Sequence, residues 1–476
     1  MNPTFFKQSF FKTLSQLIAN NQKSDVYPHL FVAFSGGLDS NVLLHLTALY
    51  ARQRELKITA VHINHGLSEN AGAWQQHCQR VCEKLGLEFV SKSVVVEQGG
   101  QGYQGLEGQA RKARYDALAQ VITDCAKSPY RLLLTGQHQQ DQVETYLLRL
   151  KRGSGAKGLA AMASSTAFYA NAFNDTYLLR PLLDVSRSAL EDYAKEQDLS
   201  WIDDESNTDT RFDRNFLRHE VIPVLNGRWP QFDEMVCRSA KHLSEQQQLI
   251  DEISEQDLLS VIDENGSLCV DGLLNLSVLR RNNVLRFWFE AHHVSMPSMV
   301  LMQRISDEVL AARVDAQPKV SWQQTVLRRF KGRIYLTSQQ LDCEGMEYIY
   351  AENQSFANSN IELMDAHGES LGQLSVNAVD VASEALLRMP KVDEQVSIRF
   401  AKKGQFNQIS CRRAGHKITQ KLGDLFKAYQ VVPWQRNRTP LIYYNQQLVA
   451  AAGLFICDSA AITDGIGLEV KVVFNN

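Results

Sequence analysis

A glycine-rich turn between an apolar run and a helical pattern is the feature that most restricts how this chain can fold. It lies at residues 30–46, LFVAFSGGLDSNVLLHL. Residues 30–34 are short and mostly apolar, which is typical of a buried strand. Glycines without a Cβ atom let backbone amides approach an anion closely, and the start of the following helix adds a partial positive charge. The stretch therefore predicts a phosphate-binding loop between a strand and a helix of an α/β fold.

This loop lacks the lysine of a Walker A sequence, GxxxxGK[ST], which neutralises the β and γ phosphates of a nucleotide. The first lysine after the loop is Lys57, and Asp39 lies within the loop. A carboxylate beside a polyphosphate suits a Mg²⁺ ion. We therefore expect a polyphosphate at the loop and Mg²⁺ on Asp39, with these residues binding the phosphates: Ser35, Gly36, Gly37, Leu38, Asp39 and Ser40. The alternative is a tight turn in which Asp39 and Ser40 only cap the helix.

Short apolar runs alternate with amphipathic stretches over the first 220 residues. We expect strands at LFVAF, KITAVHI, EFVSKSVVV and RLLLTG, with helices to residue 50 and at about 74–85, 107–125 and 141–150. This alternation is typical of a parallel sheet. A loop, EQGGQGYQG, interrupts it; such a loop closes over a ligand or is a simple connection.

The character of the sequence changes after that region. Residues from about 231 to 310 have helical periodicity, and strand-like segments appear from about 320. The predicted fold class is α/β: an N-terminal parallel-sheet, Rossmann-like domain (1–220), a mainly helical middle domain (221–345) and a mixed α+β C-terminal domain (346–476).

Charge and composition restrict the class of protein. The formal net charge is −3, but residues 398–423 contain no acidic residue and seven Lys or Arg. Such a stretch is either a solvated face or a nucleic-acid contact. The N-terminal segment predicts an amphipathic helix with Phe6, Phe10, Leu14 and Leu17 on one face, not a signal peptide. No apolar run is long enough to span a bilayer, and the eight scattered cysteines suggest reduced thiols and a cytoplasmic location.

Polar residues follow the predicted strands where ligands of open α/β sheets bind. His62 ends the second strand, and ARKARY places Arg111 and Arg114 on one helix face, where both can meet phosphates. Asp141 and Glu144 follow His138 on one face of the next helix. The alternatives are ordinary strand-end polarity for His62 and first-turn helix acids for Asp141 and Glu144.

The loop SGGLDS resembles that of the PP-loop ATP pyrophosphatases, which adenylate a substrate oxygen and release pyrophosphate. Further blocks are ARKARYDAL, LKRGSGAKGL, LLRPLLDVSRSALEDYA, WIDDESNTDTRFDRNFLR and GHKITQKLGDLFKAYQVVPWQRNRTPLIYY. Together they resemble the tRNA(Ile)-lysidine synthetase family, from about residue 30 to 230 and again near the C-terminus. The blocks LKRGSGAKGL and DESN…RNFLR are more specific than the loop.

This resemblance implies a defined reaction and partners. ATP would adenylate the wobble cytidine of a tRNA(Ile) with a CAU anticodon, and the amine of free L-lysine would displace AMP to give lysidine. The implied catalytic residues are Asp39, Arg114, His138, Asp141 and Glu144, and His62 and Arg111 join the ATP site. The expected tRNA-binding residues are Lys151, Arg152, Arg214, Arg218, Arg412, Arg413, Lys417, Lys421 and Arg436, with Lys417 and Lys421 one turn apart on a helix. The assembly state stays open, with a homodimer as one option.

One position departs from the family pattern, which has two adjacent aspartates where this chain has Gln140 and Asp141. An amide cannot ionise or act as a base. The competing functions are thiolation of a tRNA base, a PP-loop amidotransferase and a catalytically silent tRNA-binding protein. The absence of a CxxC pair disfavours the first, and Asn2 after the initiator methionine disfavours the second.

Overall fold

A computed structural model describes most of the chain: residues 3–22, 26–64, 70–94, 106–168, 176–203, 208–313, 316–338, 343–349, 356–364, 370–380, 385–402 and 404–474. The loop EQGGQGYQG lies outside these residues. The chain divides into two compact units, residues 1–251 and 252–476. The three-domain division expected from the sequence stays a prediction. No helix in the described ranges is both long and apolar enough to cross a membrane.

The first unit is built on a six-stranded sheet with the strand order β3-β2-β1-β4-β6-β5. Its parallel strands are β1 (His29–Ala33), β2 (Lys57–Asn64), β3 (Glu88–Ser93), β4 (Arg131–Leu134) and β6 (Thr176–Leu179). The predicted parallel sheet is therefore confirmed. The short edge strand β5 (Ser165–Ala167), antiparallel to β6, was not expected, since three residues give too little periodicity to detect.

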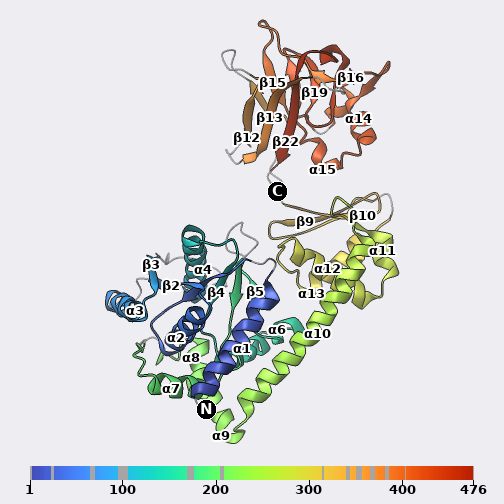
Figure 1. The fold of residues 1–476 in the computed structure, drawn as a ribbon. Helices are drawn as coiled ribbons and strands as arrows, with labels where there is room; N and C mark the ends of the chain where they lie inside the picture. The colour runs from blue at the N-terminus through green and yellow to red at the C-terminus, as the bar shows by residue number, and fades with distance from the viewer. Residues whose placement is uncertain are drawn as a thin grey trace. The chain divides into compact units, whose positions relative to one another are not determined.

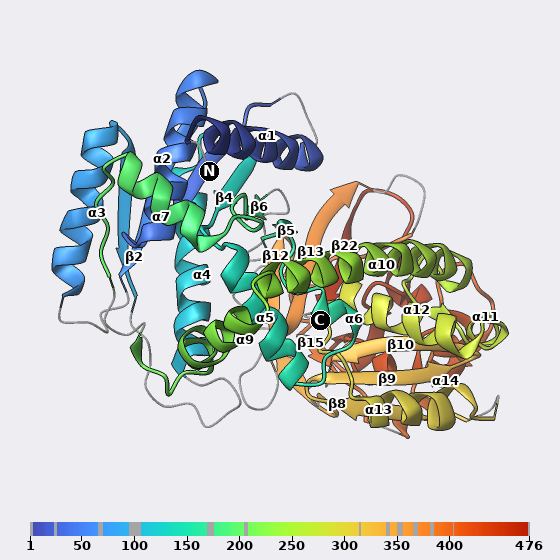
Figure 2. The ribbon, with the colours of Figure 1, turned by 90° about the horizontal axis from the view of Figure 1, so that it is seen from below.

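Helices cover both faces of this sheet (Figure 1 and Figure 2). One face buries Leu30 and Val32 of β1 against α1 (Pro3–Asn21), α2 (Leu38–Gln53), α3 (Ala71–Leu85) and α7 (Arg187–Glu196). The other face buries Phe31 against α4 (Leu106–Cys125). The alternation follows from the two-residue period of a strand. The four apolar residues predicted on one face of the N-terminal helix all lie in this core: Phe6, Phe10, Leu14 and Leu17.

A second group of helices continues from the sheet. It comprises α5 (Gln139–Lys151), α6 (Ala156–Leu159), α8 (Asp213–Phe216), a π-helical turn (Leu217–Val221), α9 (Ile222–Arg228) and α10 (Phe232–Val261). Val143 of α5 is fully buried against Ile222 and Val236. This small core attaches the segment after residue 208 to α5.

The second unit begins with helices packed on an antiparallel sheet, in the order β7-β10-β9-β8 (Leu268–Cys269, Arg333–Ser338, Thr325–Phe330 and Lys319–Trp322). The helices are α11 (Val270–Asn275), α12 (Val278–Ala291) and α13 (Met299–Arg304), followed by a π-helical turn (Ile305–Leu310). Trp288 and Phe289 of α12 are buried at the centre of their shared core.

The rest of the second unit is mainly β. One sheet has the order β11-β15-β18-β19-β20 (Glu347–Ile349, Val396–Arg399, Leu441–Tyr444, Gln447–Ala451 and Phe455–Ile456). Another has the order β12-β13-β22-β14-β21 (Ser359–Met364, Ser370–Asp380, Ile466–Phe474, Leu386–Leu387 and Ala461–Ile462). A two-stranded ribbon, β16 (Ser410–Arg412) and β17 (Thr419–Lys421), precedes α14 (Leu422–Ala428) and α15 (Pro433–Arg436).

The ribbon corrects one expectation. Lys417 and Lys421 are not on a common helix, because Lys417 lies in the turn of the ribbon and Lys421 ends β17. The helix begins only at Leu422, whose side chain is fully buried. Both lysines are nevertheless exposed.

Candidate active site

The strand order places the candidate site at the carboxyl ends of β1 and β4. These strands are neighbours, but the chain leaves β1 toward β2 on one side and later returns to β4 on the other. Ligands of open α/β sheets bind at such a point of reversal. Asp39 follows β1, and His138 follows β4. The topology therefore brings together residues that are about a hundred positions apart in sequence.

The turn after β1 has the shape that its glycines predicted. Gly36 has a φ of +87°, and a Cβ atom there would lie 2.9 Å from the sulfur of Cys78. Gly37 is the residue before α2 and is in an extended conformation. Ser35 Oγ lies 3.1 Å from Ser40 Oγ, so the two hydroxyls meet across the turn. The backbone and hydroxyl groups of the predicted ATP loop thus converge at the start of α2.

Asn41 is a residue of this turn that the sequence did not single out. Its buried amide donates to the carbonyl of Gly36 at 2.8 Å and to that of Gly37 at 3.2 Å. These bonds fix the two peptide groups on which the loop conformation depends. The SGGLDSN pattern contains the signal for it, because an amide side chain can fold back onto a preceding turn.

His138 joins two carboxylates. Its Nε2 lies 3.6 Å from Oδ2 of Asp39 and 3.6 Å from Oδ2 of Asp141, and its side chain is almost fully buried. The backbone amide of Gln140 donates to Nδ1, which leaves the ring proton on Nε2, facing the carboxylates. Burial opposes a positive charge here, but Asp39 and Asp141 outweigh it and raise the pKa of His138. The pKa of Asp39 is lowered by the nearby His138, Arg187 and Arg218 despite its burial.

Glu144 is fully buried one turn further along α5. Arg218 donates from Nε to its Oε1 at 2.7 Å and approaches Oδ1 of Asp141 at 3.5 Å. The other oxygen, Oε2 of Glu144, accepts no hydrogen bond from the described residues. Burial raises the pKa of Glu144, and Arg218 partly offsets this. A buried carboxylate of this kind is suited to accept a proton or to hold a cation.

Arg218 reaches this place from the π-helical turn that follows α8. Lys151 at the end of α5 binds Asp213 of α8 at 2.9 Å, while Arg218 binds Glu144 nearer the start of α5. The segment therefore runs along α5 in the opposite direction. π-Helical turns occur frequently at functional sites. The sequence grouped Arg218 with the tRNA contacts, but its guanidinium points to the acidic residues.

Three other predicted residues, His62, Arg111 and Arg114, have different surroundings. Nδ1 of His62 donates to the carbonyl of Phe34 at 2.9 Å, and burial lowers the pKa of His62. His62 is therefore neutral and supports the end of β1, while its role in ATP binding stays a prediction. Arg111 and Arg114 both lie near the ring of Tyr115, at 4.9 Å and 5.7 Å from its centroid, so the predicted pair does share one helix face.

Comparison with known proteins now adds to this geometry. Residues 7–225 match the PP-loop domain, 268–335 the TilS substrate binding domain and 396–470 the TilS substrate C-terminal domain. A tRNA(Ile)-lysidine synthase from Serratia proteamaculans (strain 568) is 42% identical over 438 residues, covering 92% of this chain and 93% of that protein. One from Enterobacter sp. (strain 638) is 39% identical over 446 residues, covering 94% and 97%. The chain belongs to the tRNA(Ile)-lysidine synthase family.

As a member of this family, the chain is expected to use ATP with Mg²⁺, and Asp39 fits that ion. Its Oδ1 is buried and accepts no hydrogen bond from the described residues. Mg²⁺ is usually held by one or two carboxylates together with substrate phosphates. Among the described residues no group of three or more His, Cys, Asp and Glu could hold a metal alone. The unpartnered Oδ1 of Asp39 is therefore compatible with one ligand position of such an ion.

The position that departs from the lysidine synthase pattern lies in the first turn of α5. The backbone amide of Gln140 donates to Nδ1 of His138, the N-cap residue of α5, whereas the side-chain Oε1 of Gln140 is buried and accepts no hydrogen bond from described residues. Gln140 thus replaces the first aspartate of the family pattern with a neutral amide, which adds no negative charge beside Asp141.

The other predicted tRNA-binding residues of the first unit lie at the end of α5 and on α8. They are Lys151, Arg152 and Arg214. Lys151 and Arg152 are exposed, and Arg214 is half-buried. Glu144 lies nearer the start of α5, and Arg218 lies in the π-helical turn directly after α8. The predicted RNA-binding charges therefore lie on or next to elements that adjoin the candidate site.

The C-terminal basic residues have partners but stay accessible. Arg412 pairs with Asp458, and Arg413 donates to the hydroxyl of Tyr429 at 3.2 Å. Arg436 donates to the carbonyl of Val431 at 3.0 Å. It also lines a cavity of about 400 Å³ in the second unit.

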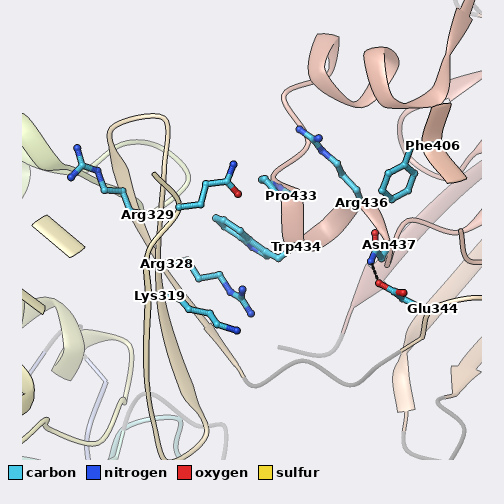
Figure 3. Close-up of a pocket in the computed structure, with 10 residues that line it drawn as sticks. Lys319, Arg328, Arg329, Glu344, Phe406, Pro433, Trp434, Arg436 and Asn437 are labelled. Atoms are coloured by element: carbon cyan, nitrogen blue, oxygen red, sulfur yellow. Dashed lines mark hydrogen bonds between the residues drawn. The ribbon is translucent and has the colours of Figure 1, made fainter. Parts of the chain in front are cut away.

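Basic and aromatic residues from separate segments of the chain line this cavity (Figure 3). The sequence did not predict that they lie together. Lys319 and Arg328 line it from the β8–β9 hairpin, and the Arg328 guanidinium lies 5.5 Å from the centroid of Trp434. Trp434 also contacts Phe330 and Tyr335 edge-on, at 6.1 Å and 5.2 Å between centroids. Cations beside an aromatic ring are common where proteins bind single-stranded nucleic acid.

Proposed function

We infer that this chain is a lysidine-forming ligase: it adenylates the wobble cytidine of a tRNA(Ile) with a CAU anticodon and transfers free L-lysine to it, releasing AMP and pyrophosphate. In a chain of this family, the observation that carries the inference is the meeting of His138 with Asp39 and Asp141 beside the phosphate loop. The product changes codon reading from AUG to AUA.

The nucleotide step uses the loop at the start of α2. Backbone amides of Gly36 and Gly37 and the hydroxyls of Ser35 and Ser40 bind the pyrophosphate part of ATP. Asp39 would hold a bound Mg²⁺ ion, which would neutralise phosphate charge. Because the reaction occurs at the α-phosphate, the loop does not need the lysine that assists transfer of a γ-phosphate. Arg111 and Arg114 stabilise the charge on the transferred AMP.

The second step needs a site for lysine beside the adenylated base. Its ammonium must be recognised by a carboxylate and must lose a proton before attack. Asp141 and Glu144 serve these purposes, since Oε2 of Glu144 has no partner among the described residues and burial raises the pKa of Glu144. Arg218 keeps both carboxylates in place.

The tRNA is held outside the reacting centre by cations. Arg152, which follows the C-terminal end of α5, and Arg214 of α8 contact tRNA phosphates, and the C-terminal residues Lys417, Lys421 and Arg436 bind the phosphate backbone of the tRNA body. Contacts remote from the anticodon help to distinguish this tRNA from the methionine tRNA with the same anticodon. A homodimer is compatible with this arrangement but is not required by it.

The direct test is transfer of radiolabelled lysine to a CAU tRNA(Ile) transcript in the presence of ATP. We expect label in the tRNA in a one-to-one ratio with AMP and pyrophosphate. Omission of ATP and a transcript with another wobble base are the controls. Binding of the tRNA without any label transfer would refute the ligase function and favour a silent tRNA-binding protein.

A further inference from the structure

A second cavity, of about 350 Å³, lies in the first unit between α4 and the β5–β6 edge of the sheet. Its charged lining residues are Arg111, Lys112, Arg180 and Asp116, and aromatic rings come from Tyr115 and Phe168. The lining thus has an excess of positive charge. Of these lining residues, the sequence predicted a ligand contact only for Arg111.

Arg180 is the buried member of this lining, with 7% of its surface exposed. Its Nη1 donates to the carbonyl of Ala163 at 2.7 Å, while its Nε has no hydrogen-bond partner among the described residues. A buried guanidinium with an unused donor is costly unless a negative group comes to it. This residue is therefore the strongest indication that the cavity binds an anion.

The neighbouring cations are arranged around Tyr115. Arg111 donates from Nη2 to the Tyr115 hydroxyl at 3.2 Å and lies over its ring. The ring of Phe168 is 5.8 Å from that of Tyr115. Lys112 is exposed beside them. The lining thus combines two guanidinium groups, one ammonium, one carboxylate and two aromatic rings.

The cavity lies on the opposite face of the sheet from α2, the helix that follows the ATP loop. The helix α2, which carries Asp39, packs on the face that buries Leu30, whereas α4 packs on the face that buries Phe31. Arg180 directly follows β6, which is parallel to β4 and β1. It therefore lies at the carboxyl ends of the strands, two strands away from β1.

We propose that this cavity is an anion subsite that binds a phosphate group of a substrate, with Arg180 as its buried donor and Arg111 and Lys112 at its opening. The proposal rests on the proposed function, which supplies two phosphate-bearing substrates: ATP and the tRNA backbone. Arginine presents a planar set of donors to phosphate, and aromatic rings beside it suit an attached ribose or base.

The test measures two affinities of the full-length protein. Calorimetry gives the affinity for an ATP analogue with a methylene group between the α and β phosphates. Filter binding over a range of salt concentrations gives the affinity for the tRNA transcript. The variants are Lys112→Gln, Arg180→Lys and Arg180→Gln. Lys195→Gln is the matched control, because Lys195 is an exposed lysine of α7, which packs on the opposite face of the sheet.

We expect Arg180→Gln to weaken one of the two affinities by roughly tenfold or more, and Lys112→Gln and Arg180→Lys to weaken the same one by roughly threefold. If only the ATP analogue is affected, the phosphate belongs to ATP. If only the tRNA is affected, and its log–log salt slope falls by about 1, the phosphate belongs to the tRNA backbone.

Affinities within twofold of the Lys195→Gln control for both ligands would overturn the subsite, as would a wild-type protein that binds neither ligand. If Arg180→Gln does not fold, Lys112→Gln and Arg111→Gln carry the test, since both side chains are exposed. These binding measurements do not depend on lysine transfer. Loss of the subsite and failure of the ligase function are therefore distinguishable.

Discussion

At the scale of single residues, Asp39 lies close to His138 and is the residue that we propose to hold Mg²⁺. Its carboxylate is stabilised as an anion by neighbouring cations, which lower the pKa of Asp39 despite its burial. Its Oδ1 has no partner among the described residues. An amide at this position would have nearly the same shape but could not offer an anionic oxygen to the metal.

We therefore predict that Asp39→Asn reduces formation of adenylated tRNA at least ~100-fold while tRNA affinity stays unchanged. Pyrophosphate release that depends on tRNA measures the first quantity, and filter binding measures the second. Asp203→Asn is a suitable control, because Asp203 is an exposed acid of the same unit. Activity near the wild-type level would remove Asp39 from the metal site.

Arg218 acts on the acidic residues through charge. Burial raises the pKa of Glu144, and the adjacent guanidinium limits this rise. Removing the cation would raise the Glu144 pKa further. A base with a higher pKa is ionised only at higher pH, so the acid side of the pH–rate profile should move upward.

We predict this shift for Arg218→Met, with a smaller one for Arg218→Lys, in the pH dependence of lysine transfer at saturating ATP and tRNA. Arg152→Gln, which removes an exposed charge at the end of the same helix α5, should leave the profile in place. A lower rate without any movement of the acid side would mean that Glu144 is not the base.

At the scale of elements, the turn between β1 and α2 depends on one backbone conformation. Gly36 has a positive φ, and Cys78 of α3 leaves no room for a Cβ atom. A residue with a side chain would have to adopt a strained conformation and move Cys78 at the same time. The conformation of the phosphate loop thus depends on its packing against α3.

Gly36→Ala should therefore raise the KM for ATP and lower stability by about 1–3 kcal/mol. The double variant Gly36→Ala/Cys78→Ala should recover only the share of the lost stability and ATP affinity that the clash with Cys78 causes. The rest should remain, because the φ at residue 36 is still unfavourable. Gly72→Ala is the matched control, since a Cβ atom there meets nothing within 4 Å. Urea unfolding and ATP titration measure the two effects. Full recovery in the double variant would show that space, not φ, sets the need for glycine.

At the scale of the whole molecule, the distribution of charge matters more than its sum. The net charge is −3, yet Lys417 and Lys421 are exposed in a stretch without acidic residues. Each lysine that neutralises a tRNA phosphate releases counterions, so binding weakens as salt rises.

Charge reversal of Lys417 and Lys421 to Glu should weaken tRNA binding and reduce the magnitude of its log–log salt slope by about 2. The control is reversal of Lys391 and Lys471, two exposed lysines elsewhere in the same unit. Filter binding at several salt concentrations gives both slopes. Equal slopes for the two double variants would place the tRNA elsewhere.

The sequence by itself determined the elements whose signals are local. The period of apolar residues predicted β1 to β4 and the helices between them, and the glycines of SGGLDS predicted the phosphate loop. Family-specific blocks such as LKRGSGAKGL indicated the reaction. The helix expected at Lys417 was wrong, because lysines one turn apart are equally compatible with a turn followed by a strand.

Only the tertiary structure decided which side chains meet. The reversal of strand order between β1 and β4 brings His138 to Asp39, and the antiparallel run of residues 213–218 along α5 turns Arg218 toward Glu144. The buried Arg180 was not predicted as a functional residue for the same reason. A local pattern reports the conformation of a segment, but contacts between distant segments depend on how the sheet is ordered and which faces are buried.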